Sequence, residues 1–142
     1  MKSKLPLKIV TFAPNSFHLM LKVKINGKVA NLVLDTGASH SALDLSRISK
    51  FENRKELIKN SDKTTGLGTN TMESHVLTLK KMKLGDICLF EYDALIVDLS
   101  HINKTYESLK LPQIDGVLGS DILFYLNAKI DFGKKMLSLK IK

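Results

Sequence analysis

The chain has 142 residues, a formal net charge of +8 and a single cysteine, Cys88. This length suits one domain with a real core and excludes two full domains, so we expect residues 1–142 to form a single domain. One cysteine excludes a disulfide within the chain, and the apolar neighbours of Cys88 predict a buried thiol, so we expect a reducing, cytoplasmic location. No apolar run approaches the length of a membrane span, so we expect no membrane partner.

The positive charge would suit an acidic partner such as nucleic acid, a membrane surface or an acidic peptide. The lysines are scattered, however, and the short clusters Lys80-Lys81-Lys83 and Lys134-Lys135 are expected at hairpin turns. Aromatic residues make up only 6% of the chain, too few to predict a platform on which bases stack. We therefore interpret the charge as a solvated surface and expect no nucleic-acid partner.

The first part of the chain is predicted to form strands followed by one short helix. Strands are expected at residues 5–12, 17–25 and 29–34. Pro14-Asn15 breaks the first two strands apart, and Asn26-Gly27 is typical of a tight hairpin turn. Further along, Ser49 to Glu52 has the pattern of a capping box, which predicts a short helix to about Ile58.

The second part of the chain is also predicted to be rich in strands. Strands are expected at residues 74–79, 87–90, 94–97, 128–132 and 136–141. Gly85-Asp86 and Asp131-Phe132-Gly133 are read as turns, and Ile102, Tyr106 and Leu109 recur at helical spacing. Because no repeat or linker interrupts the pattern, we expect a mainly β protein, one closed β-barrel with one or two short helices.

The most informative segment is the five-residue run Asp35-Thr36-Gly37-Ala38-Ser39, which directly follows the apolar residues 32–34. A carboxylate at the end of a buried strand is costly to desolvate, so an acid in this position is expected to do chemistry. Gly37 permits a sharp turn, and the Thr36 hydroxyl can fix the loop by hydrogen bonding. Asp35 is therefore the candidate catalytic residue.

A second segment, Val117-Leu118-Gly119, lies far downstream and reads as a short buried strand. Ser120 is placed to cap a helix that runs to about Leu126. An Asp-Thr-Gly loop followed by an apolar-apolar-Gly strand and a helix resembles the retropepsin-like family, the single-lobe aspartic proteases that include the retroviral enzymes. This resemblance implies a retropepsin-like barrel in which residues 117–119 cross behind the Asp35 loop.

The resemblance also implies a mechanism. The chain has no second Asp-Thr-Gly or Asp-Ser-Gly, so the second acid must come from another copy of the chain. The implied enzyme is a homodimeric aspartic endopeptidase that hydrolyses a peptide or protein substrate without metal or cofactor. Its two Asp35 carboxylates share one proton and activate a water. Thr36 would reach across the two-fold axis, the Gly37 N–H would face the carboxylate, and a terminal strand such as 136–141 would pair across the dimer.

The sequence also suggests roles for one glycine-rich turn, one histidine and two further acids. Gly66-Leu67-Gly68 falls where the family has its flap, and the alternative is an ordinary surface turn. His40 is either a pH-sensitive subsite residue or, as we expect, an exposed or structural side chain. Asp115 and Asp121 are expected to serve locally, in a turn and in the first turn of a helix respectively.

Three classes of function fit these features. The first is the aspartic endopeptidase, the second a catalytically silent peptide-binding or dimerisation module on the same fold, and the third a basic barrel that binds nucleic acid. The intact Asp35-Thr36-Gly37 sequence favours the first over the second. The scarcity of aromatic residues counts against the third.

Overall fold

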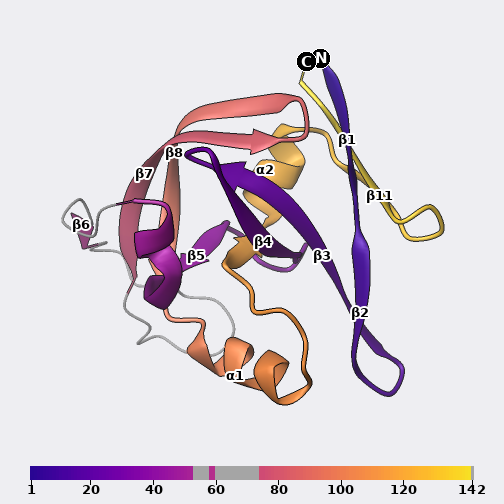
Figure 1. Ribbon diagram of the computed structural model, residues 1–142. Coiled ribbons are helices and arrows are strands. Elements are labelled where there is room, and N and C mark those ends of the chain that lie inside the picture. Colours follow the sequence, from indigo (N-terminus) through magenta and orange to yellow (C-terminus); the bar gives the residue numbers. More distant parts are fainter. Residues whose placement is uncertain (53–57, 60–73, 142) are drawn as a thin grey trace.

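The computed structural model describes residues 1–52, 58–59 and 74–141 (Figure 1). The expected flap turn Gly66-Leu67-Gly68 lies outside the described residues. The strands are β1 (Lys2–Pro6), β2 (Lys8–Ala13), β3 (Ser16–Ile25), β4 (Lys28–Leu34), β5 (Ala42–Asp44), β6 (Ile58–Lys59), β7 (His75–Leu84), β8 (Ile87–Val97), β9 (Gly116–Leu118), β10 (Lys129–Asp131) and β11 (Met136–Lys140). The helices are a 3-10 helix, η1 (Leu45–Lys50), and the α-helices α1 (Ser100–Ser108) and α2 (Ser120–Tyr125).

Six of these strands close into a barrel. The larger sheet runs in the order β2-β3-β4-β9-β5-β8-β7-β6, and β3 pairs additionally with β7 through Lys24↔Lys83 and Ile25↔Met82. That extra pairing joins β3, β4, β9, β5, β8 and β7 into a ring, which leaves β2 and β6 as its extensions (Figure 1). The expectation of a mainly β protein with a closed barrel and short helices is confirmed.

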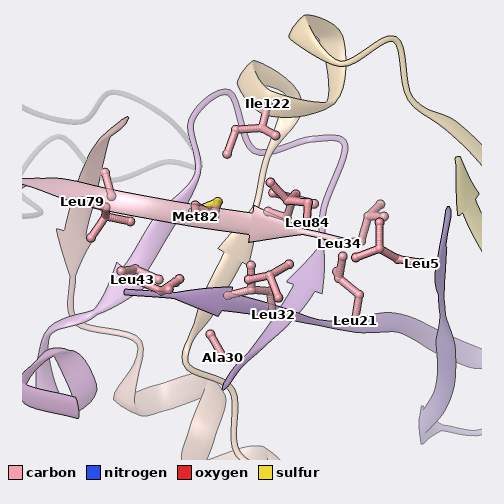
Figure 2. Packing of buried hydrophobic residues seen from close by; sticks show 14 of the residues in the cluster. Leu5, Leu21, Ala30, Leu32, Leu34, Leu43, Leu79, Met82, Leu84 and Ile122 are labelled. Atoms are coloured by element: carbon pink, nitrogen blue, oxygen red, sulfur yellow. The ribbon is translucent and has the colours of Figure 1, made fainter. Parts of the chain in front are cut away.

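Alternating apolar residues fill the barrel. On β4 the side chains of Ala30, Leu32 and Leu34 are buried, whereas those of the residues between them are less so. Figure 2 shows them gathered with Leu84 of β7 and Ile122 of α2 between the strands. Each fully buried aliphatic side chain stabilises the fold by about 1.5–3 kcal/mol. The strand that leads to Asp35 is therefore anchored by its inner face.

A second apolar cluster lies on the other face of β4 and β9, under helix α1. Its buried members are Val10, Met20, Val97, Leu99, Tyr106 and Ile114. The partly buried side chains of Val33 and Val117 pack against it. The parallel pair β4–β9 is thus covered on both faces, as parallel strands generally are. Helix α1, predicted from its periodicity, is present and forms this cover.

The remaining three strands form a separate sheet in the order β1-β11-β10 that brings the two chain ends together (Figure 1). Strand β11 pairs with β1 along one edge and with β10 along the other. Its apolar side chains Leu137 and Leu139 are buried in the core of the same chain. The expectation that residues 136–141 pair across a dimer is therefore wrong, because both edges of that strand are already used.

The expected strand 5–12 is divided in two at Leu7. Strand β1 ends at Pro6, whose missing N–H cannot continue a ladder, and the Leu7 N–H donates to the carbonyl oxygen of Lys135 instead. The chain then enters the barrel sheet as β2, paired with β3. The break allows one continuous stretch of sequence to serve both sheets.

Strands β7 and β8 are longer than expected. Lys80, Lys81 and Lys83 lie within β7, so their expected placement at a turn is wrong; Leu79, Met82 and Leu84 keep that strand anchored in the core. Lys134 and Lys135 do lie in a turn. The expected strands 87–90 and 94–97 form a single strand, β8, which stays paired with β7 on both sides of Glu91.

Cys88 lies in β8 but is only partly buried, so the expectation of a buried thiol is wrong. Successive side chains of a strand point to opposite faces, and it is the neighbouring Ile87 that enters the core. Within the described parts of the chain, no helix is long and apolar enough to cross a membrane.

Two helix starts differ from the expectation. Ser49 is not a helix N-cap, because it lies within η1, which starts where the Asp44 side chain accepts from the Ser46 N–H at 3.3 Å and has the buried Phe51 as its C-cap. Residues 53–57 of the expected helix lie outside the described residues. The buried acid is the stronger local cap. Helix α2 is present as predicted, but Gly119 is its N-cap and Ser120 makes no capping hydrogen bond.

Candidate active site

The Asp35 loop is held by its own backbone and by the neighbouring strand β9. The Asp35 N–H donates to the carbonyl oxygen of Leu118 at 3.0 Å, and the Ala38 N–H donates to the Asp35 carbonyl oxygen at 3.1 Å. The Gly37 N–H donates to Asp35 Oδ1 at 2.9 Å, the contact that the resemblance implied. Asp35, Thr36 and Gly37 are all exposed. One carboxylate oxygen is therefore fixed, while the acid itself faces outward.

Strand β9 runs beside β4, where residues 117–119 were expected to lie. The two strands pair in parallel through Leu32↔Gly116, Val33↔Val117 and Leu34↔Leu118. Two glycines permit this close packing, because a Cβ would lie 2.3 Å from Ala42 O at Gly116 and 2.7 Å from Ala38 O at Gly119. The Ser120 N–H donates to that same Ala38 oxygen at 2.7 Å, which ties the loop to the start of α2.

Asp121 organises the segment just after the loop. Its Oδ1 accepts from the N–H and the hydroxyl of Ser41 at 3.0 and 2.8 Å, and the Ser41 hydroxyl accepts from the Gly119 N–H at 2.8 Å. Its Oδ2 accepts from the Tyr92 hydroxyl. Burial and the adjacent Asp121 raise the pKa of Tyr92 well above its ordinary value. Asp121 lies in the first turn of α2 as expected. Its side chain also connects this helix to Ser41, just before β5, and to Tyr92 of β8.

His40 belongs to the same cluster. Its Nδ1 lies 3.3 Å from Asp121 Oδ2, its Nε2 lies 3.1 Å from the carbonyl oxygen of Asp93, and its ring stacks on Tyr92 with 5.9 Å between centroids. The side chain is held between α2 and β8. The structural interpretation of His40 therefore fits better than that of a free subsite residue.

Asp115 is fully buried and holds a network remote from Asp35. Its carboxylate accepts hydrogen bonds from Arg47 Nε at 2.7 Å, Lys50 Nζ at 3.4 Å and the Asn31 N–H at 2.8 Å. Its own N–H donates to the Asn31 carbonyl oxygen at 2.7 Å. The role is structural, as expected, but its partners are distant in sequence rather than local. The network fixes the start of β9 against β4 and η1.

Asp44 is the second fully buried acid. It accepts from the Leu99 N–H and from the Asn103 amide, each at 3.1 Å, as well as from Ser46. The Asn103 side chain also exchanges two hydrogen bonds with the backbone of Ile114. All of these groups are satisfied by the fold, so Asp44 orients α1 and does not join the Asp35 site.

A cleft of about 410 Å³ opens next to the acid. Asp35 and Thr36 form part of its wall, and most of the remainder is apolar, including Phe17, Leu19, Val33, Ile102, Val117 and Phe132. Phe17 and Phe132 are exposed. The cleft combines one acid with an apolar lining, as small-ligand and peptide subsites generally do.

Two further polar side chains, His18 and Tyr106, line this cleft. The Tyr106 hydroxyl and His18 Nδ1 form a hydrogen bond, and the His18 ring stacks on Phe12 with 4.5 Å between centroids. Burial raises the pKa of Tyr106. The sequence analysis missed both as site residues: the spacing of Tyr106 marked it only as a helix residue, and no local pattern marked His18.

Among the residues with described positions, no group of three or more His, Cys, Asp or Glu side chains is arranged to hold a metal ion. The acid-base groups at the cleft are therefore Asp35, His18 and Tyr106. Asp35 is the one that lies on the exposed loop beside Thr36 and Gly37.

Comparison with protein families identifies the class. Residues 21–122 match the family described as aspartyl protease. The match spans the Asp35 loop, strand β9 and the start of α2. The chain belongs to this aspartyl protease family. A search of curated proteins found no match.

Solved structures give the same fold. A retropepsin-like aspartic protease from Rickettsia conorii is 17% identical with a TM-score of 0.61, covering 99% of this chain and 91% of that one. The retroviral protease-like domain of Ddi1 from Leishmania major is 14% identical with a TM-score of 0.61, covering 86% and 87%. EIAV protease in complex with the inhibitor HBY-793 is 24% identical with a TM-score of 0.56, covering 87% and 100%. The expected retropepsin-like barrel is confirmed.

Proposed function

We propose that the protein is an aspartic endopeptidase whose active site forms when two chains each contribute Asp35. The observation that carries the proposal is the Asp35 loop itself. The acid is exposed at the end of a buried strand, Oδ1 is fixed by the Gly37 N–H, and the backbone is clamped on β9. Membership of the aspartyl protease family supports the same chemistry.

The need for two chains follows from the number of acid loops. The sequence contains one Asp-Thr-Gly, and the chemistry requires a second carboxylate to share a proton with the first. Asp35, Thr36 and Gly37 are exposed, so the loop is open to a second copy of itself. A two-fold axis through this loop makes each Asp35 the partner of the other, with Thr36 reaching the opposite loop.

In the proposed mechanism the ionised Asp35 takes a proton from a water held between the two acids. The protonated Asp35 donates a hydrogen bond to the scissile carbonyl oxygen as negative charge develops on it. Water attacks the carbonyl carbon, and the proton then passes to the leaving amine. No covalent intermediate forms on the protein, and no cofactor takes part.

The substrate in this proposal is a peptide or protein segment that lies across the loop. The apolar lining of the cleft beside Asp35, with Val33 and Val117 on its wall, supports an apolar side chain next to the scissile bond. Ala38 and Ser39 follow the acid and are proposed to face the substrate backbone. Gly66-Leu67-Gly68 is proposed as the flap. Cytoplasmic location stays a prediction from the sequence.

The experiment that tests this function is cleavage of a diverse peptide library at mildly acid pH. It is run with and without an inhibitor that carries a hydroxyl group in place of the scissile peptide. Asp35→Asn removes cleavage with the fold intact, whereas Asp86→Asn, at an exposed residue of the β7–β8 turn, does not. Peptide binding without cleavage would instead favour the silent module.

A further inference from the structure

His18 and the acid lie at the same end of the β3–β4 ladder. Leu19 of β3 pairs with Leu34 of β4, and the same register places His18 opposite Asp35 at the point where the ladder ends. Both side chains line the cleft. The His18 ring is held in place by its stack on Phe12, at an interplanar angle of 19°. A group on this ring therefore has a fixed position beside the acid.

The hydrogen bond to Tyr106 determines which nitrogen of His18 carries the proton. Tyr106 is 1% exposed, and across the described residues its hydroxyl has His18 Nδ1 as its one recorded partner. A buried hydroxyl hydrogen without an acceptor would cost about 1–3 kcal/mol, so the hydroxyl donates and Nδ1 accepts. The neutral ring then carries its proton on Nε2.

Among the residues that the structure describes, the Nε2–H of His18 has no hydrogen-bond partner. The His18 side chain is only partly buried, and its Nε2 is open to solvent in the cleft. Apart from Asp35, Thr36 and Tyr106, the side chains that share the cleft with it are apolar, with Leu19, Ile102 and Val117 on the walls. A side chain that fills the cleft displaces this solvent, and the Nε2–H then needs an acceptor from the ligand.

We infer that His18 is a specificity-determining residue whose Nε2–H, oriented by Tyr106, selects a substrate side chain with an apolar body and a hydrogen-bond acceptor at its tip. Tyrosine and glutamine have this form, whereas their near-isosteres differ: phenylalanine has no acceptor and methionine has only a weak one, its thioether sulfur. The inference rests on the proposed peptidase function for its consequence in catalysis. The position and protonation of His18 do not depend on that function.

The first test is cleavage of paired peptides that differ only as tyrosine against phenylalanine, or glutamine against methionine, at each position flanking the scissile bond. At one of these positions the wild-type protein has a kcat/KM on the order of tenfold higher for the acceptor-bearing member. His18→Leu abolishes this preference, and His18→Gln, which keeps an N–H donor, retains part of it. Equal rates for both members in the wild type, or an unchanged preference in His18→Leu, would overturn the inference.

The second test needs no cleavage. Nitrogen NMR of the wild-type protein at mildly alkaline pH reports the His18 tautomer, which is Nε2–H in this account and mixed in Tyr106→Phe. N-acetyl-tyrosinamide shifts the Nε2 resonance, and N-acetyl-phenylalaninamide does so far less. A proton on Nδ1, or equal shifts with the two probes, would overturn the inference. If the wild type cleaves no peptide but shows the tautomer and the selective shift, the proposed function fails and the role of His18 in binding stands.

Discussion

The Asp35 N–H lies 3.0 Å from the carbonyl oxygen of Leu118, so the acid loop begins where strand β9 ends. This hydrogen bond continues the parallel pairing of Leu34 with Leu118 past the end of β4. The backbone position of the acid is thereby set by a strand from the opposite end of the sequence. Substitutions in β9 and at the start of α2 should consequently alter the position of the Asp35 carboxylate, although the substituted side chains do not contact it.

Gly119→Ala should lower activity while leaving most of the fold in place. Its Cβ would lie 2.7 Å from the Ala38 carbonyl oxygen and 2.9 Å from the His40 carbonyl carbon, so the loop must move away from α2. Overpacking of this kind costs about 1–3 kcal/mol. Gly133→Ala is the matched control, because its Cβ meets Asp131 at an ordinary 3.5 Å. Thermal unfolding and peptide cleavage check both variants, and full activity in Gly119→Ala would show that the loop is not clamped.

Tyr92 should make stability fall at alkaline pH. Its pKa is raised above the ordinary 10.0 by burial first and by Asp121 second, so ionisation above about pH 10 favours the unfolded chain. The stabilising contribution is complete below that pH and declines as the pH rises beyond it. Urea unfolding followed between about pH 8 and pH 11 should show a flatter decline for Tyr92→Phe than for the wild type. Tyr125→Phe, at an exposed residue of α2, is the control, and an identical decline in Tyr92→Phe would contradict the assignment.

Arg47→Leu should destabilise the fold because, among the described residues, it leaves Lys50 at 3.4 Å as the one cation that pairs with the buried Asp115 carboxylate. Removing one partner of a fully buried pair costs about 3–5 kcal/mol; Arg47 is 30% exposed, so we expect on the order of 2–3 kcal/mol. The double variant with Asp115→Asn should recover part of this loss, since no unpaired charge remains. Urea unfolding measures both changes, and additive losses in the double variant would count against the ion pair.

Local sequence patterns were enough to predict the acid loop, its strand and the overall class of fold. The residues from Leu32 to Ser39 predict a buried strand followed directly by a turn. The second motif, at residues 117–119, is recognised from a short apolar run followed by a glycine. Both features depend on neighbours in sequence. Periodicity likewise located α1, whereas α2 was predicted from the resemblance and from a cap at Ser120, and only the helix itself is confirmed.

The features that the sequence did not reveal depend on contacts between distant residues. Asp121 reaches Ser41, Asp115 reaches Arg47, and His18 meets Tyr106 only after the barrel closes. The capping box at Ser49 failed for the same reason, because the long-range bonds of Asp44 fix an earlier helix start. A local pattern holds no information about which of two possible caps the core will bury.

The dyad formed by two chains is the central claim, and subunit mixing tests it most directly. Wild-type protein is mixed with increasing amounts of Asp35→Asn protein at constant total concentration, allowed to exchange subunits, and assayed for peptide cleavage. Because a heterodimer has one intact acid, activity should follow the square of the wild-type fraction, and Asp86→Asn chains mixed in the same way should cause no loss. Activity that falls only in proportion to the wild-type fraction, with sedimentation showing monomers, would contradict a site built from two Asp35 residues.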